Sequence, residues 1–285
     1  MNAALCSSGF RPFFLRGSVD GPILAVFWYG ERLGWWSLPA ASVSPLLLHA
    51  HEFVFGFACA IVCGVLLTAL PSWAGAAELR GAPLAMLALL WCAGRAAFLL
   101  ADWLPRAIVI FADCALFPAL GSMLVPALSG ARKRLFLWTV PPLVALAAGN
   151  IVFHFAIPRT PNDDALWGIS LGMHALAFLF SLYGGLLTPA FTRNYLRARG
   201  ERAAAILVPL EYATAIAMVA FAAADLTEAP PAWMASAAFI AVALHAIRFA
   251  RWRGWRTAGE PLLWTLHLGY AWLIAAIALR GISAL

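Results

Sequence analysis

Long apolar runs separated by short polar connections dominate the pattern of the chain. Most runs reach about 20 residues, the length that an α-helix needs to cross the hydrocarbon core of a bilayer. The period-two alternation of a membrane β-barrel is not seen. No connection is long enough to separate domains, so residues 1–285 are predicted to form one all-α membrane domain, a polytopic transmembrane helical bundle. The nine predicted spans lie near residues 12–30, 45–70, 82–104, 106–130, 135–156, 165–191, 203–225, 231–252 and 260–280.

The composition supports this fold class. Of the 285 residues, 64% are hydrophobic and 11% are charged, whereas soluble domains average about 45–50% and about 25%. The net charge of +6 does not indicate nucleic-acid binding, because the basic residues lie in short connections. The first residues lack the features of a removable signal peptide. The five scattered cysteines are expected to be packing residues rather than disulfides.

The distribution of arginine and lysine predicts the orientation of the helices. With a cytoplasmic N-terminus, fourteen basic residues fall on the cytoplasmic side and four on the outer side, as the positive-inside rule requires. The C-terminus is then outside, and Arg95 lies within the membrane. The cytoplasmic residues are Arg11, Arg16, Arg80, Arg132, Lys133, Arg134, Arg193, Arg197, Arg199, Arg202, Arg248, Arg251, Arg253 and Arg256. The outer residues are Arg32, Arg106, Arg159 and Arg280.

Ionisable residues inside the predicted spans are the candidate functional groups, because each is costly to place in a bilayer. The run His49-Ala50-His51-Glu52 brings two imidazoles and a carboxylate into one span. On a regular α-helix His49 and Glu52 share a face, and His51 points nearly the opposite way. The two histidines therefore cannot easily bind the same metal ion: one could ligate it while the other supports the ligand, or each could serve a different centre.

The predicted depths of the polar residues define two layers. Histidines on separate helices at one depth are typical of a bundle that holds metal centres between facing helices. The outer layer comprises His49, His51, Glu52, Arg95, Asp113, His174 and, at the end of its span, His154. The inner layer comprises His245 and His267, with Glu211 as a carboxylate that supports them. We expect His49, His51, Glu52 and His174, with His154 as a weaker member, to form an outer metal centre, and His245 and His267 to form an inner one.

Each group also has a structural interpretation. Arg95 and Asp113, on adjacent antiparallel helices, favour a buried ion pair, although Arg95 could instead neutralise Glu52 or a haem propionate. His154 could cap a helix end in contact with water. A lone histidine such as His245 often bonds a neighbouring carbonyl.

The ligand types narrow the class of metal. Six histidines without a CxxC motif or clustered carboxylates disfavour iron–sulfur and calcium sites. Imidazole sites without thiolate suit haem iron, copper or zinc. Any haem would be non-covalent b-type, because no CxxCH motif is present. A Gly-rich phosphate loop and a nucleophile elbow are absent from the sequence too.

Several longer strings resemble the NnrS family of bacterial integral membrane proteins, from the first predicted helix to the last. They are GFRPFFL at 9–15, HAHEFVFGF at 49–57, LLTALPSWAG at 66–75, TPAFTRN at 188–194, RWRGWRT at 251–257 and PLLWTLHLGYAWL at 261–273. The family's histidine pair before glutamate falls on His49, His51 and Glu52, and its late histidine falls on His267. The resemblance implies a multi-pass protein of the bacterial inner membrane that carries haem b and copper. It also implies further C-terminal helices with another histidine segment, without which a metal site would be incomplete.

The resemblance further implies a role in the response to nitric oxide (NO) and nitrosative stress, or beside denitrification. The favoured hypothesis is a haem/copper protein in the lipid bilayer that binds or detoxifies NO or iron–nitrosyl species. A quinol-linked NO-reductase-like enzyme is an alternative; it needs an electron donor and a proton path, for which Glu52 and Arg95 are the outer-layer candidates. A permease that handles copper or another metal without catalysis is the third hypothesis.

Overall fold

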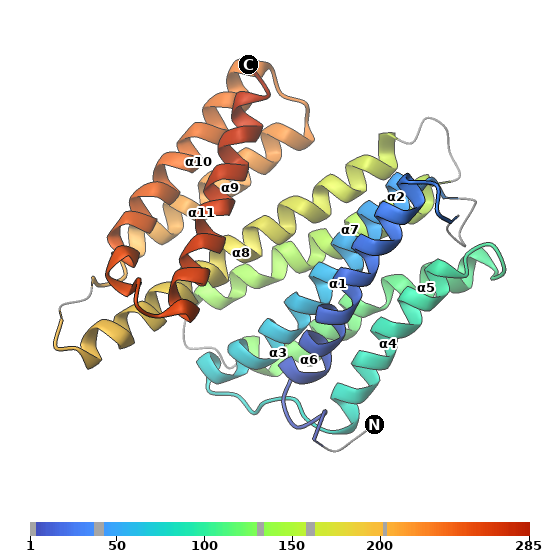
Figure 1. Ribbon diagram of the computed structural model, residues 1–285, viewed down its shortest axis with the longest axis horizontal. Helices are drawn as coiled ribbons and strands as arrows, with labels where there is room; N and C mark the ends of the chain where they lie inside the picture. The colour runs from blue at the N-terminus through green and yellow to red at the C-terminus, as the bar shows by residue number, and fades with distance from the viewer. Residues whose placement is uncertain (1–3, 37–42, 130–133, 158–162, 202–203) are drawn as a thin grey trace. The chain divides into compact units, whose positions relative to one another are not determined.

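The structure, a computed structural model, describes residues 4–36, 43–129, 134–157, 163–201 and 204–285. Every regular element in these ranges is helical, and they contain no strand (Figure 1). Eight helical stretches are long and apolar enough to cross a membrane. The predicted all-α polytopic bundle is confirmed. The eight stretches are Pro45–Ala74, Ala82–Leu99, Arg106–Ser129, Phe136–Ala156, Asp163–Ala198, Val208–Leu226, Pro231–Arg251 and Pro261–Ile282.

The first of the nine predicted spans also folds as a helix, α1 (Phe10–Arg32), but it is not among these eight. Its 23 residues include Arg11, Arg16, Asp20, Glu31 and Arg32, which lower its apolar character. Some of the basic residues that predict the orientation lie outside the described residues, namely Arg132, Lys133, Arg159 and Arg202.

The chain divides into two compact units, Met1–Ala175 and Leu176–Leu285. The second half of α8 (Asp163–Ala198) belongs to the second unit. In the first unit α1 packs against α3, and α4 packs against α5. The further helices of this unit are α2 (Pro45–His51), α3 (Cys59–Ala74), α4 (Ala82–Leu99), α5 (Arg106–Cys114), α6 (Leu116–Ser129) and α7 (Val140–Ala156), with a 3-10 helix, η2 (Arg134–Thr139), before α7.

A π-helical segment, η1 (Glu52–Ala58), joins α2 to α3 within one apolar stretch. A π-helix is wider than an α-helix, so it shifts the faces that follow relative to those before it. The regular α-helix assumed for this stretch is therefore wrong at Glu52–Ala58.

The start of α1 is tied to the connection between α3 and α4. Ser8 donates a hydrogen bond to the carboxylate of Glu78, and the backbone N–H of Gly9 donates to the same oxygen at 3.1 Å. The N–H of Gly81 donates to the carbonyl of Cys6 at 2.9 Å. Burial acts to raise the pKa of the Glu78 carboxyl, but hydrogen bonds from Ser8, Arg80 and Gly9 outweigh it and hold that pKa below its ordinary value. We call these contacts the N-terminal clamp.

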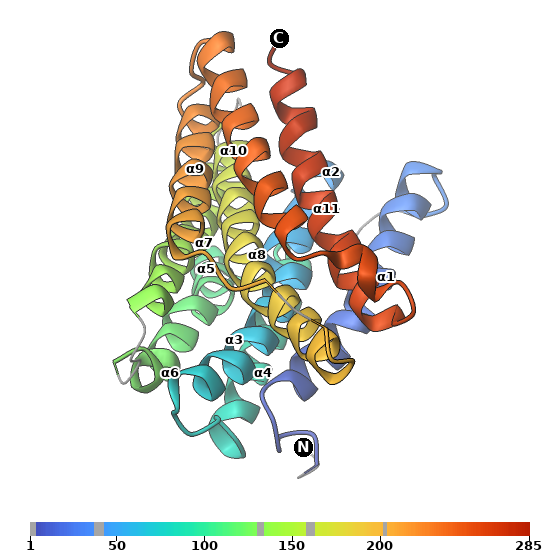
Figure 2. The ribbon, with the colours of Figure 1, turned by 90° about the vertical axis from the view of Figure 1, so that its left-hand side faces the viewer.

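In the second unit α10 (Pro231–Arg251) lies between α9 (Val208–Leu226) and α11 (Pro261–Ile282), as Figure 2 shows. Their shared core includes Phe221 and the fully buried Tyr270. A short 3-10 helix, η3 (Gly254–Thr257), connects α10 to α11.

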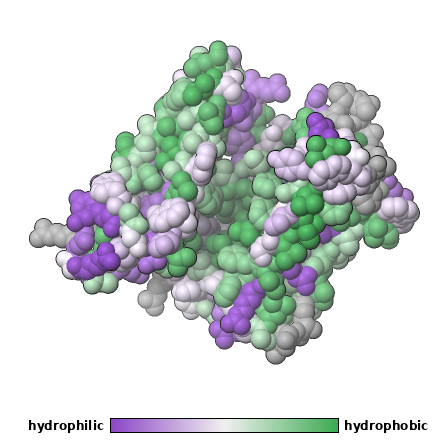
Figure 3. All heavy atoms as spheres, viewed as in Figure 1, coloured by the Kyte–Doolittle hydropathy of each residue, from purple (hydrophilic) through white to green (hydrophobic). Residues whose placement is uncertain are grey.

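The outer surface of the second unit carries large apolar side chains. Ile216, Ile240 and Trp272 are 60%, 58% and 65% exposed, although all three lie in membrane-length helices. Figure 3 shows apolar residues along these helices, with a large group of hydrophilic residues at one end of the unit and a smaller group at the other. A helix that is apolar on its outer as well as its inner face is expected in a bilayer.

Candidate metal site

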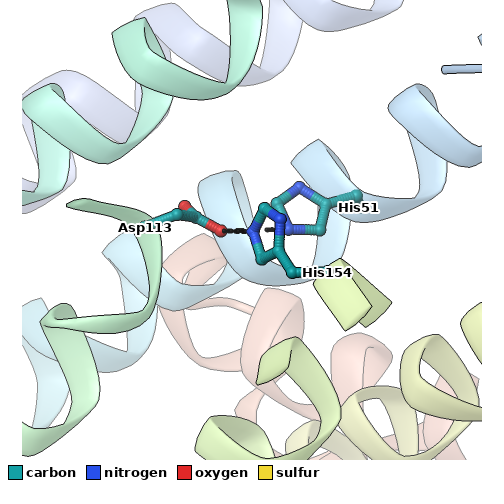
Figure 4. A group of neighbouring side chains, drawn as sticks. All are labelled: His51, Asp113 and His154. Carbon is teal, nitrogen blue, oxygen red and sulfur yellow. Dashed lines mark hydrogen bonds and ion pairs between the residues drawn. The ribbon is translucent and has the colours of Figure 1, made fainter. Parts of the chain in front are cut away.

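Three ionisable residues from three helices meet inside the first unit (Figure 4). His51 ends α2, Asp113 lies in α5 and His154 lies in α7. One ligand atom from each lies within 4.8 Å of the other two, and all three side chains are buried. The helices that carry them are separated by up to about a hundred residues of sequence, so this group depends on tertiary packing.

Asp113 is the centre of the group. Its Oδ2 lies 2.7 Å from Nε2 of His154 and 3.1 Å from Nε2 of His51. Asn150 donates to the same oxygen at 3.0 Å, and its own Oδ1 lies 2.9 Å from Nε2 of His51. Asn150 precedes His154 by four residues, so one face of α7 supplies both side chains.

Arg95, in α4, joins the group to Glu52. It donates to Oε1 of Glu52 at 2.5 Å and also pairs with Oδ1 of Asp113. The predicted Arg95–Asp113 ion pair is therefore present, and the same guanidinium also neutralises Glu52. A side chain at Gly56 would meet Nη1 of Arg95 at 2.9 Å, so glycine leaves the space that the guanidinium fills.

The charges of this network do not balance. One arginine faces two carboxylates, which leaves a net charge of −1 when both acids are ionised. An uncompensated charge is expensive in a buried, low-dielectric site. A bound metal cation would supply the missing positive charge.

Aromatic rings enclose His51. Its ring centroid lies 4.2 Å from that of Phe98, 4.4 Å from that of Phe153 and 5.1 Å from that of Phe55. All three phenylalanines are at most 1% exposed. The enclosure keeps water away from the imidazole and restricts its orientation.

The donor set fits a transition-metal ion. Two imidazole nitrogens and a carboxylate oxygen are ligands that copper, zinc and non-haem iron accept. Metal-bound histidines usually direct their second ring nitrogen at a carboxylate or carbonyl. Nδ1 of His51 lies 3.2 Å from Oε1 of Glu52, as that arrangement requires. An ion at Nε2 would replace the proton that this nitrogen shares with Asn150 and Asp113.

His49 and His174, the other predicted outer ligands, are not part of this group. His49 stacks on Trp28, with ring centroids 4.4 Å apart, and lines a cavity of about 160 Å³ beside Glu52. Pockets for drug-sized ligands have roughly 300–1,000 Å³. The cavity at His49 is therefore too small for haem. His174 is half-buried in α8.

The predicted inner ligands are held by hydroxyl and carbonyl groups of the second unit. Nδ1 of His245 lies 2.8 Å from the carbonyl of Ala241, and its Nε2 lies 2.8 Å from Oγ of Ser181. Nε2 of His267 lies 2.9 Å from Oγ1 of Thr192. Within the described parts of the chain, neither histidine joins a group of three possible ligands. Both ring nitrogens of His245 already have partners.

Glu211, expected to support the inner histidines, pairs with Arg248 instead. Arg248 is 2% exposed, although its sequence position suggested the cytoplasmic surface. It also donates to the carbonyl of Ser181 at 3.0 Å and to the hydroxyl of Tyr270 at 2.9 Å. Its spacing of three residues from His245 was the available signal, because residues i and i+3 share a helix face. Asn150 was also missed, although it lies four residues before His154 on the same face of α7.

The family profile described as NnrS protein matches residues 4–285, which is essentially the whole chain. No curated protein matches the chain, and no solved structure matches it. The match includes every residue of the buried group in the first unit and the polar cluster of the second. The chain belongs to the NnrS family.

Proposed function

We propose that this protein binds a copper ion at His51, Asp113 and His154 in the bacterial inner membrane, and that it binds or detoxifies NO there. Membership of the NnrS family supports a membrane protein of the nitric oxide response in general. The observation that carries the proposal is the buried group of two imidazoles and one carboxylate. Copper is chosen because the family resemblance implies it, and two imidazoles with a carboxylate are ligands that copper accepts.

The surrounding residues would prepare the site for the ion. Glu52 orients the imidazole of His51, Asn150 donates to Asp113, and Arg95 holds Asp113 and Glu52 in place. The phenylalanine rings exclude water. A bound transition-metal ion would supply a coordination position for NO.

The cavity beside His49 is too small for haem b, so the family resemblance alone implies that group. Turnover of NO with a reductant would distinguish the quinol-linked reductase from the favoured function. Net transport of metal across the membrane would distinguish the permease.

The test is metal analysis of the purified protein in lipid nanodiscs, with optical and electron paramagnetic resonance spectra before and after addition of NO. The wild type is expected to hold copper whose spectrum changes with NO. His51→Ala and His154→Ala are expected to lose the copper. His245→Ala and His267→Ala are the matched controls, because they remove buried histidines of the second unit, and they should keep it.

Equal copper content in all four variants would overturn the assignment of the site. A Soret band in the wild type would show haem bound outside the cavity beside His49. Melting temperatures of the four variants separate loss of the ligand from loss of the fold.

A further inference from the structure

A cavity of about 160 Å³ lies in the first unit beside the buried polar network. Its polar lining comes from Asp20 in α1, His49 in α2, Glu52 in η1 and Arg95 in α4. Apolar side chains, among them Leu24, complete the wall. The metal group itself does not line this cavity.

Three of the lining residues hold a buried polar atom without a hydrogen-bond partner among the described residues. They are Asp20 with Oδ2, His49 with Nδ1 and Arg95 with Nε. Buried polar groups nearly always have a partner, either in the protein or in ordered water. Because the three residues come from three helices and share one cavity, the missing partner belongs in that cavity.

The chemistry of the lining defines the occupant. Nε of Arg95 can only donate a hydrogen bond, whereas an ionised Asp20 can only accept one. A molecule that serves both groups must therefore accept a hydrogen bond from Arg95 and donate one to Asp20, as a water molecule does.

We propose that this cavity is a hydrated chamber, which holds a cluster of water molecules and admits other small neutral hydrogen-bonding molecules beside Glu52 and Arg95. The volume of the cavity is large enough to hold several water molecules. The chamber brings water next to two residues that contact the candidate metal group. The proposal goes beyond the proposed function and does not depend on the identity of the metal.

Hydroxyl-radical footprinting of the metal-free protein in nanodiscs tests the chamber, because the radicals form from water that touches the side chain. Trp28 lines the cavity and is half-buried, whereas Trp272 is 65% exposed on a membrane-length helix that lipid should cover. Trp28 is expected to be oxidised several-fold faster than Trp272. Oxidation of Trp28 at or below the rate of Trp272 would overturn the proposal.

A filled cavity gives the second measurement. Leu24→Phe adds volume to the wall and is expected to reduce oxidation of Trp28 to the level of Trp272. Leu89→Phe, on an exposed face of α4, is the matched control and should change nothing. Unchanged oxidation of Trp28 in Leu24→Phe would place the water outside the cavity and overturn the proposal. If that variant does not fold, the wild-type comparison decides alone.

Discussion

Asp113 holds the buried polar network of the first unit together through both of its carboxylate oxygens. One oxygen pairs with Arg95, and the other contacts His51, His154 and Asn150. Such a network is sensitive to loss of any member, because each remaining polar group is left in a low-dielectric interior. Asn150 is the member that can be removed without removing a charge or a candidate ligand.

Replacement of Asn150 by alanine is expected to weaken copper binding by about 10- to 100-fold, which is typical for groups that orient metal ligands. The physical reason is that Asp113 loses the amide donor that holds its carboxylate in place. Competition with a copper chelator measures the change. Unaltered affinity in Asn150→Ala would show that Asp113 is positioned without this amide.

Arg248 and Glu211 form a buried ion pair in the second unit, with side chains 3% and 9% exposed. Arg248→Met is expected to destabilise the protein by about 3–5 kcal/mol, because Glu211 is left buried without a counter-ion. Arg280→Met breaks the pair with Asp225, whose arginine is 47% exposed, and is expected to cost at most about 1 kcal/mol. Thermal unfolding in detergent compares the two.

The double variant Arg248→Met/Glu211→Gln serves as the control, because it removes the isolated charge together with the arginine. Part of the lost stability should return in it. An equal loss in the Arg248 and Arg280 variants would contradict the difference in burial on which this prediction depends.

Single residues were predicted from the sequence where their type alone was informative. Ionisable side chains in apolar runs identified His51, Asp113 and His154 as candidates, and the adjacent helices predicted the Arg95–Asp113 pair. Which of them meet could not be predicted, because it depends on the rotation of each helix about its axis. Asn150 was missed because a neutral amide in an apolar helix gives no charge signal.

At the scale of the element, the π-helix η1 determines how α2 is rotated about the helix axis relative to α3. Its backbone hydrogen bonds join residues i and i+5 rather than i and i+4, so the helix is wider and the histidine run and α3 are not in α-helical register. Periodicity of apolar residues gave no sign of this, because both sides of a membrane helix are apolar. The predicted opposition of His51 and Glu52 failed here: Nδ1 of His51 lies 3.2 Å from Glu52.

Deletion of Phe53 tests the role of η1. Because a π-helical segment accommodates an extra residue within an otherwise α-helical stretch, the deletion is expected to convert the segment to α-helix and to keep α2 and α3 close to their present relative rotation, so His51 stays near Asp113. Copper binding and helix content by circular dichroism should therefore both be retained. Phe53→Ala removes the same half-exposed ring at constant length and should also keep copper. Loss of copper in the deletion variant alone would show that the π-helix itself positions His51.

At the scale of the whole molecule, apolar runs predicted the helices well. The predicted span at 231–252 is observed as Pro231–Arg251, and the one at 106–130 is observed as α5 and α6, which meet near Ala115. A chain that crosses lipid must form hydrogen-bonded helices of a fixed length, and such helices are visible in the sequence as long apolar runs. The contacts within each unit were beyond prediction, because they depend on side-chain shape at long sequence separation.

The positive-inside distribution predicts that the two ends of this chain lie on opposite sides of the membrane. Alkaline phosphatase fused after Leu285 should therefore be active, because it folds only outside the cytoplasm, and a green fluorescent protein fused there should be dark. Fusions after Gly200 should give the reverse, since the arginines near that position are predicted to be cytoplasmic. The same pattern at both positions would contradict the predicted orientation.

The N-terminal clamp has a consequence for the number of crossings. Residues Cys6–Gly9 touch Glu78–Gly81, so the chain between them forms a closed loop that starts and ends on one face of the bilayer. A closed loop must cross the bilayer an even number of times. The stretch Pro45–Ala74 is long and apolar enough to cross once. If it does, the closed loop needs a second crossing, for which α1 is the other long helix of the loop.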